Sequence, residues 1–173
     1  TSIPSGRRQP ARARRALVDA SYMQVTVPST RPPAYGVADG VTVIPPNDLP
    51  EADRPNGGFV IVGAGKTAMD AVLWLLSHEV DPAEITWITP RDSWLLNRAM
   101  IQPGPGGLRV SEQYEIAAEA DSADALFAAL EAAGHVVRID PSIAPTMYRC
   151  ATVTVAELEQ LRRVEDKIGR AHV

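Results

Sequence analysis

The residues best suited to chemistry lie in one short stretch, Gly63-Ala64-Gly65-Lys66-Thr67-Ala68, which follows an apolar run and opens a helical pattern. Gly63 lets the backbone turn, Gly65 lets a pyrophosphate approach without a Cβ in the way, and Ala68 lets the helix pack close to the strand. The free N–H groups and the positive end of the helix then attract phosphate oxygens. This pattern predicts a turn that holds the phosphates of a dinucleotide.

A nucleoside triphosphate loop is the first alternative, because Gly65-Lys66-Thr67 matches the end of the Walker A pattern. That pattern also needs a glycine five residues before its last glycine. Val60 occupies the position and lies inside the apolar run, so the triphosphate interpretation is rejected.

The segment after the second apolar run indicates which dinucleotide binds. NAD sites place an acidic residue there to accept a hydrogen bond from the ribose 2′-hydroxyl. In this chain the run is followed by Thr89, Pro90 and Arg91, and a guanidinium suits a 2′-phosphate. We therefore expect NADP(H) rather than NAD or FAD in this turn. The alternative for Arg91 is a surface ion pair with Asp92.

The elements that position these residues form a strand, helix and strand in sequence. A strand is predicted at residues 59–62, a helix at 66–77 and a second strand at 85–88. The buried side of the helix is expected to comprise Ala68, Ala71, Val72, Leu75 and Leu76. Such a unit joins two parallel strands. We predict an α/β fold with a Rossmann-type parallel sheet flanked by helices.

The rest of the chain carries weaker signals. A helix start is predicted by Ser122, a helix stop by Gly134, and a capping box by Thr154 with Glu157. The further predictions are strands at 16–20, 41–44 and 136–139, an extended piece at 24–27, an irregular segment at 89–107, and helices at 112–120, 123–133 and 155–166.

No set of side chains predicts a metal site or a nucleophile with its base, and no catalytic residue is assigned. His78 is expected at the surface, and His135 is interpreted as structural. Trp94, Arg98 and Gln102 follow the second strand, where they either line a ligand cleft or anchor a loop.

Composition narrows the class of protein. The 173 residues carry a net charge of −4, which gives no reason to expect nucleic acid, and no apolar run is long enough for a membrane span. The single Cys150 excludes an internal disulfide and a CxxC redox centre. A cytoplasmic setting fits these features.

Gly63–Asp70 together with residues 85–94 resembles the NADPH-binding domain of two-dinucleotide-fold flavoproteins, the flavin-containing monooxygenases and pyridine-nucleotide disulfide reductases. In that family the nicotinamide domain is inserted within an FAD domain. The resemblance implies that NADPH bound here passes a hydride to FAD, and that residues before Gly58 are a partial FAD-domain segment. The family's FAD fingerprint and a redox cysteine pair are absent from residues 1–173.

These observations give three expected regions: a proline-rich partial FAD-domain segment at 1–57, the NAD(P)-binding domain at 58–166, and a non-native tail at 167–173. The last seven residues match the translation of a common sequencing-adapter read.

We expect a fragment of an NADPH-dependent FAD oxidoreductase, whose partners are the nicotinamide dinucleotide and the missing FAD-domain portion of the same chain. The alternatives are a nucleotide-sensing module and a methyltransferase, which also requires an acid after strand two. Cofactor binding is assigned to Gly63, Ala64, Gly65, Lys66, Thr67, Ala68 and Arg91.

Overall fold

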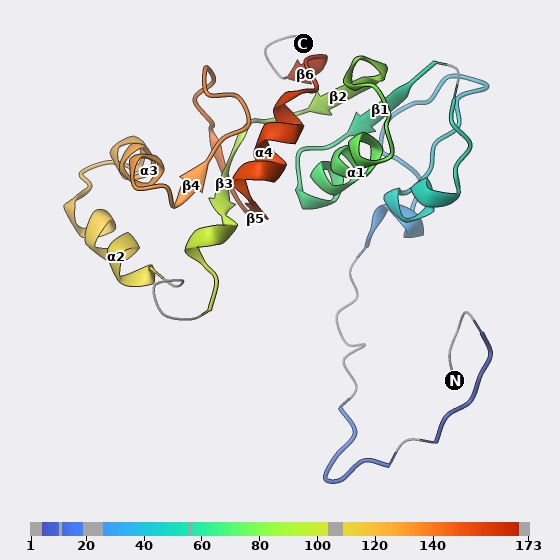
Figure 1. Ribbon diagram of the computed structural model, residues 1–173, viewed down its shortest axis with the longest axis horizontal. Coiled ribbons are helices and arrows are strands. Elements are labelled where there is room, and N and C mark those ends of the chain that lie inside the picture. Colours follow the sequence, from blue (N-terminus) through green and yellow to red (C-terminus); the bar gives the residue numbers. More distant parts are fainter. Residues whose placement is uncertain (1–4, 11, 19–25, 56, 104–108, 170–173) are drawn as a thin grey trace. The chain divides into compact units, whose positions relative to one another are not determined.

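The computed structural model describes residues 5–10, 12–18, 26–55, 57–103 and 109–169, and the chain divides into two units, Thr1–Val43 and Ile44–Val173. Among its described residues the first unit contains one short 3-10 helix, η1 (Pro28–Thr30), which begins where the Thr30 hydroxyl donates to the Val27 carbonyl at 2.9 Å. The second unit contains every strand of the described residues (Figure 1).

Two of the strands expected near the N-terminus are wrong where the structure describes them. Residues 16–18 and 41–44 form no strand, and Leu17 is 91% exposed. Residues 19–20 and 24–25 lie outside the described part, while Val27, in the expected extended piece, has extended backbone angles. A short apolar run becomes a strand only when a second strand pairs with its backbone, and these runs have no such partner among the described residues.

The central strand–helix–strand unit is confirmed. β1 (Phe59–Val62) leads into α1 (Lys66–Ser77), and the short 3-10 helix η3 (Pro82–Glu84) leads into β2 (Ile85–Thr89). β1 and β2 pair in parallel, with Phe59 opposite Ile85 and Val62 opposite Ile88. The carboxyl ends of both strands therefore lie at the end of the sheet where α1 begins.

The segment expected to be irregular, 89–107, instead contains β3 (Ser93–Asn97) and the 3-10 helix η4 (Arg98–Met100). β3 is the centre of a second sheet, antiparallel to β4 (Val136–Val137) and parallel to β5 (Met147–Val153). β3 forms because its apolar side chains are buried and both of its edges find a partner. The predicted strand 136–139 is shortened to two residues.

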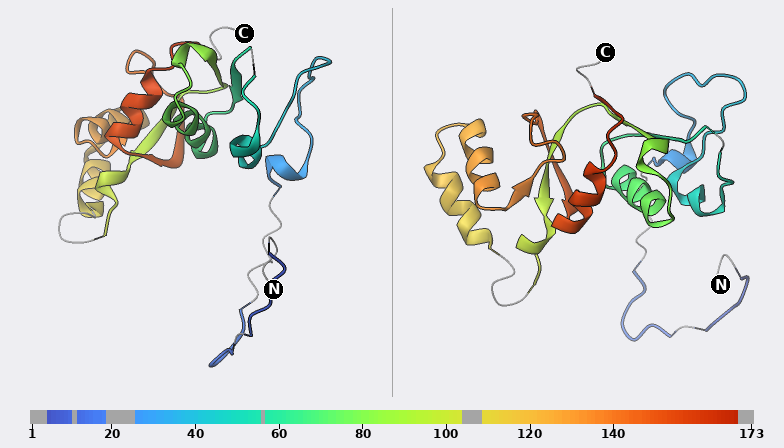
Figure 2. Two further views of the ribbon diagram at one scale, coloured as in Figure 1. Left: turned by 45° about the vertical axis from the view of Figure 1, so that its right-hand side comes forward. Right: turned by 45° about the horizontal axis from the view of Figure 1, so that its top comes forward.

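Two helices lie between β3 and β4 in sequence and side by side in space, α2 (Val110–Glu119) and α3 (Ala123–Ala132) (Figure 2). The predicted Ser122 cap is confirmed, since its side chain accepts from Ala125 N–H at 3.1 Å. The predicted stop at Gly134 is confirmed by its φ of +79°.

The chain returns to the first sheet through α4 (Val155–Arg162), whose predicted capping box is confirmed. Thr154 N–H donates to Glu157 Oε2 at 2.6 Å, and Glu157 N–H donates to Thr154 Oγ1 at 3.1 Å. β6 (Lys167–Gly169), which comprises the first three residues of the expected non-native tail, then pairs in parallel with β2 and completes the order β1-β2-β6.

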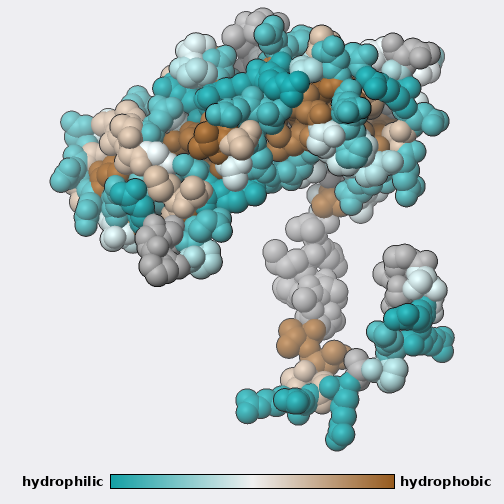
Figure 3. All heavy atoms as spheres, viewed as in Figure 1, coloured by the Kyte–Doolittle hydropathy of each residue, from teal (hydrophilic) through white to brown (hydrophobic). Residues whose placement is uncertain are grey.

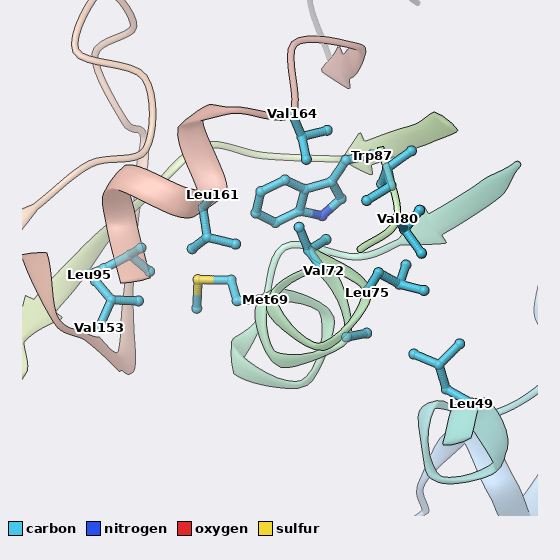
Figure 4. Packing of buried hydrophobic residues seen from close by; sticks show 12 residues of the cluster. Leu49, Met69, Val72, Leu75, Val80, Trp87, Leu95, Val153, Leu161 and Val164 are labelled. Carbon is cyan, nitrogen blue, oxygen red and sulfur yellow. The ribbon is translucent and has the colours of Figure 1, made fainter. Parts of the chain in front are cut away.

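One hydrophobic core joins both sheets of the second unit. Trp87 of β2 is fully buried, and Figure 4 shows its indole lying between Val72 of α1 and Val164. Leu161 of α4 and Leu95 of β3 belong to the same cluster. The 3-10 helix η2 (Pro46–Glu51) contributes Leu49 to it. Both hydrophilic and hydrophobic residues reach the surface (Figure 3). The unit is mixed α/β, with a small parallel sheet and packed helices.

Candidate functional site

The turn between β1 and α1 has the backbone conformation that its glycines predict. Gly63 has a φ of +129°, a region that residues with a side chain rarely adopt. Its N–H donates to the Ile88 carbonyl at 2.9 Å, and its carbonyl accepts from Trp87 Nε1 at 2.7 Å. These two bonds fasten the turn to β2, so its shape is set by the buried core beneath it.

The first turn of α1 presents unsatisfied backbone donors. Gly65 is the N-cap residue, and no side chain caps the helix. The first intrahelical bond in this turn runs from Met69 N–H to the Gly65 carbonyl at 3.1 Å. The earlier N–H groups have no partner inside the helix and are available to an anion. Ala64 and Ala68 are buried against the body of the unit, while Thr67 is exposed.

A small pocket is lined by Ala64 of the glycine turn and by Arg91, although the two are separated in sequence by α1 and β2. Its lining comprises Ala64, Thr89, Arg91, Asp92, Ser93, Leu95, Arg138 and Ile139. Arg91 is exposed, and it forms no ion pair with Asp92 or any other acid among the described residues. The two groups singled out by sequence therefore share one surface.

Asp92 adds an acidic group to this pocket. Burial raises its carboxyl pKa above the usual 3.8, and the nearby charge of Asp140 raises that pKa further. Its own backbone N–H and Lys167 oppose the shift. The fold thus favours the neutral form of Asp92 more than water does.

Arg149 is a site residue that the sequence reasoning missed. It lies on β5, and its Nε donates to the Ser93 hydroxyl at 3.2 Å. A Cβ placed on Gly65 would lie 4.0 Å from Arg149 Nη1. Across the described ranges, no acid lies within ion-pair distance of Arg149. A second guanidinium therefore lies beside the glycine turn with its Nη atoms available.

Lys66 lies at the start of α1 but is engaged with acids. Its ammonium pairs with Asp70, four residues on, and lies 3.8 Å from Glu157 Oε1. Burial by itself raises the pKa of Glu157, but the bonds from Thr154 and the charges of Lys66 and Arg98 outweigh it and lower that pKa. The Lys66 charge is consequently shared between these carboxylates and any phosphate at the turn.

The other candidate side chains are used in packing. Trp94 is buried on β3 and stacks on Phe127 at 5.5 Å between ring centroids. Arg98 donates to the Thr152 carbonyl at 3.2 Å, and Gln102 donates to the Arg98 carbonyl at 3.0 Å. None of the three lines the pocket that holds Arg91.

The two histidines examined by sequence have separate surroundings. His135 is buried and contacts Glu112 through Nε2 at 3.0 Å and Gln113 through Nδ1 at 3.2 Å, which ties the residue before β4 to α2. His78 is exposed at the end of α1 and stacks on Trp74. Both observations agree with the structural and surface interpretations.

The part of the chain that the structure describes holds neither a metal-binding cluster nor a membrane-spanning helix. No group of three or more His, Cys, Asp or Glu side chains within it is arranged to hold a metal ion. None of the helices within it combines the length and the apolar composition that crossing a membrane requires.

The chain is similar to uncharacterized proteins of mycobacteria. It is 52% identical over 164 residues to protein Rv2000 of Mycobacterium tuberculosis and to protein Mb2023 of Mycobacterium bovis. The match covers 92% of this chain and 30% of each relative, so the chain spans about a third of their length. No family model matches the chain, and no solved structure matches it.

Proposed function

We propose that the second unit is a Rossmann-type NADP(H)-binding domain, and that the protein is an NADPH-dependent FAD oxidoreductase of the monooxygenase-like kind. The observation that carries this proposal is the shared pocket of the glycine turn and Arg91. A phosphate cradle made of backbone N–H groups and a guanidinium for a second phosphate are the two requirements for NADP(H).

The pyrophosphate would occupy the start of α1. A glycine at position 65 leaves the approach to the helix N-terminus open, and Arg149 adds positive charge on the same side. Ala68 is buried. Its Cβ would lie 3.7 Å from a Cβ placed on Gly63, so the helix and the turn approach each other closely at these two residues. These features fit the close strand–helix packing of a dinucleotide turn.

Arg91 distinguishes the two nicotinamide dinucleotides. It follows the carboxyl end of β2, where the adenine ribose of a dinucleotide lies in folds of this type. A guanidinium binds a phosphate in a bidentate manner, whereas a 2′-hydroxyl needs a carboxylate acceptor. Arg91 is exposed and has no acid partner among the described residues, which favours NADP(H).

The flavin part of the proposal rests on the sequence resemblance. NADPH supplies a hydride, FAD accepts it, and the protein positions the two rings. The length of the mycobacterial relatives leaves room for a flavin-binding portion outside the matched segment. The physiological setting consistent with a nicotinamide-dependent enzyme is the cytoplasm.

The test is a titration of the full-length protein with NADPH and NADH. A charge-assisted hydrogen bond contributes about 1.5–3 kcal/mol, so Arg91→Ala is expected to weaken NADPH binding about ten- to a hundred-and-fifty-fold and to leave NADH unchanged. Arg54→Ala is the matched control, because Arg54 pairs with Glu84 at the opposite end of β2. Equal losses for both dinucleotides would remove the 2′-phosphate assignment.

The colour of the same protein separates an oxidoreductase from the sensing alternative. A flavoenzyme is yellow, and NADPH bleaches its flavin absorbance without air. A colourless protein that binds NADPH would instead be a nucleotide-sensing module. A colourless protein that ignores NADPH would contradict both.

A further inference from the structure

Within the second unit, one face of the β1-β2-β6 sheet exposes aliphatic side chains. Along β1 the side chains alternate: Phe59 and Ile61 pack against the core, while Val60 is 62% exposed and Val62 is 44% exposed. On the neighbouring strand Ile88 is half-buried. Large aliphatic side chains on this face therefore have little to pack against.

The helices that cover this sheet all contribute to its other face. Trp87 points into the core, where it meets Val72 of α1 and Val164 just after α4 (Figure 4). Since side chains alternate along a strand, the residues that flank Trp87 in β2 point to the opposite side. In the described part of this unit, nothing buries Val60 and Val62 from that side.

The composition of β1 is that of a strand buried on both faces. Parallel sheets occur almost only with both faces covered, and their strands are continuous hydrophobic runs rather than alternating ones. Phe59-Val60-Ile61-Val62 is such a run, with no polar residue at either outward position. Opposite Val60 on β2 lies Thr86, whose hydroxyl donates to Asp166 Oδ2 at 2.5 Å, so the aliphatic side chains that this face leaves at least partly exposed include Val60, Val62 and Ile88.

The mycobacterial relatives are longer than this chain. The chain matches the mycobacterial proteins over only 30% of their length, so most of each relative lies outside the matched segment. We propose that the face formed by Val60, Val62 and Ile88 is an internal interface, covered in the full-length protein by an apolar segment of polypeptide that flanks residues 1–173. This proposal rests on packing and is independent of the ligand at the glycine turn.

The experiment measures thiol accessibility in the full-length protein. Val60→Cys is made in a Cys150→Ser background, because Cys150 is an exposed free thiol. Glu159→Cys, on the exposed side of α4, is the matched control. We expect maleimide to modify position 60 at least about tenfold more slowly in the native protein than in denaturant. If Val60→Cys does not fold, Val62→Cys takes its place.

A photo-crosslinker at position 60 then identifies the cover. A benzophenone side chain there is expected to link to a peptide from outside residues 1–173 of the same molecule. A link to a second copy, to another protein or to a residue within 1–173 would overturn the proposal. Labelling at the denatured rate, with the control labelled equally fast, would overturn it as well.

Discussion

Replacing Arg149 by alanine is predicted to weaken both nicotinamide dinucleotides by a similar factor. Arg149 lies beside the helix N-terminus, 4.0 Å from where a Gly65 Cβ would be, and the proposed ligand group at that point is the pyrophosphate. NADPH and NADH share their pyrophosphate. The effect of Arg149 therefore differs in kind from that of Arg91, which is expected to act on NADPH alone.

The size of the effect follows from the hydrogen bonds that Arg149 makes. Its Nε is occupied by the Ser93 hydroxyl at 3.2 Å, which leaves the Nη atoms for the ligand. One charge-assisted bond lost corresponds to about 1.5–3 kcal/mol, or a ten- to a hundred-and-fifty-fold rise in Kd for both dinucleotides. Arg149→Lys keeps the charge but loses the bond to Ser93, so an intermediate loss is expected.

The assay is calorimetric titration of the full-length protein with NADPH, NADH and ADP-ribose. Ser93→Ala serves as the positioning variant: it removes the partner of Nε, and a bond of this kind contributes about 0.5–1.5 kcal/mol, so a loss of a few-fold is expected. Unchanged affinity for all three ligands in Arg149→Ala would refute the reasoning. A loss confined to NADPH would move Arg149 from the pyrophosphate to the 2′-phosphate.

Two further predictions concern stability. Gly63→Ala is expected to lower the free energy of unfolding, measured in urea titrations, by about 1–3 kcal/mol, because a φ of +129° strains any residue with a side chain. Gly57→Ala is the control: Gly57 has open space around it and no positive φ, so its replacement should change the free energy of unfolding little. Asp92→Asn is expected to stabilise the protein near neutral pH. The folded-state pKa of Asp92 is raised above 3.8, so its contribution to stability is fully present below that value and is lost as pH rises through the folded pKa. Urea titrations at pH 7 and pH 3 check this: a gain of equal size at both would show that the carboxylate charge is not its cause.

The sequence was sufficient for the elements that depend on local pattern. The bounds of β1 and α1 agree with the prediction because a continuous apolar run, two glycines and a 3.6-residue period all specify the same boundaries. The capping box of α4 and the Gly134 stop are similarly local. These signals do not depend on what the rest of the chain does.

The second sheet could not be predicted in the same way. β3 follows Pro90 closely and lacks a periodic pattern, so no local signal predicts it. It forms a strand because it pairs with β4 and β5, which are distant in sequence. Arg149 was missed for the same reason, because only the parallel pairing of β5 with β3 brings it to the turn. Arg91 was found because its position relative to the glycine turn is set by one strand–helix–strand unit.

The indole of Trp87 gives the turn a property of its own. It is fully buried in the core and still donates to the Gly63 carbonyl, so a core side chain holds the backbone of the turn in place. A binding loop held in its final shape loses little conformational entropy when an anion arrives. Association should then proceed without a slow rearrangement of the turn.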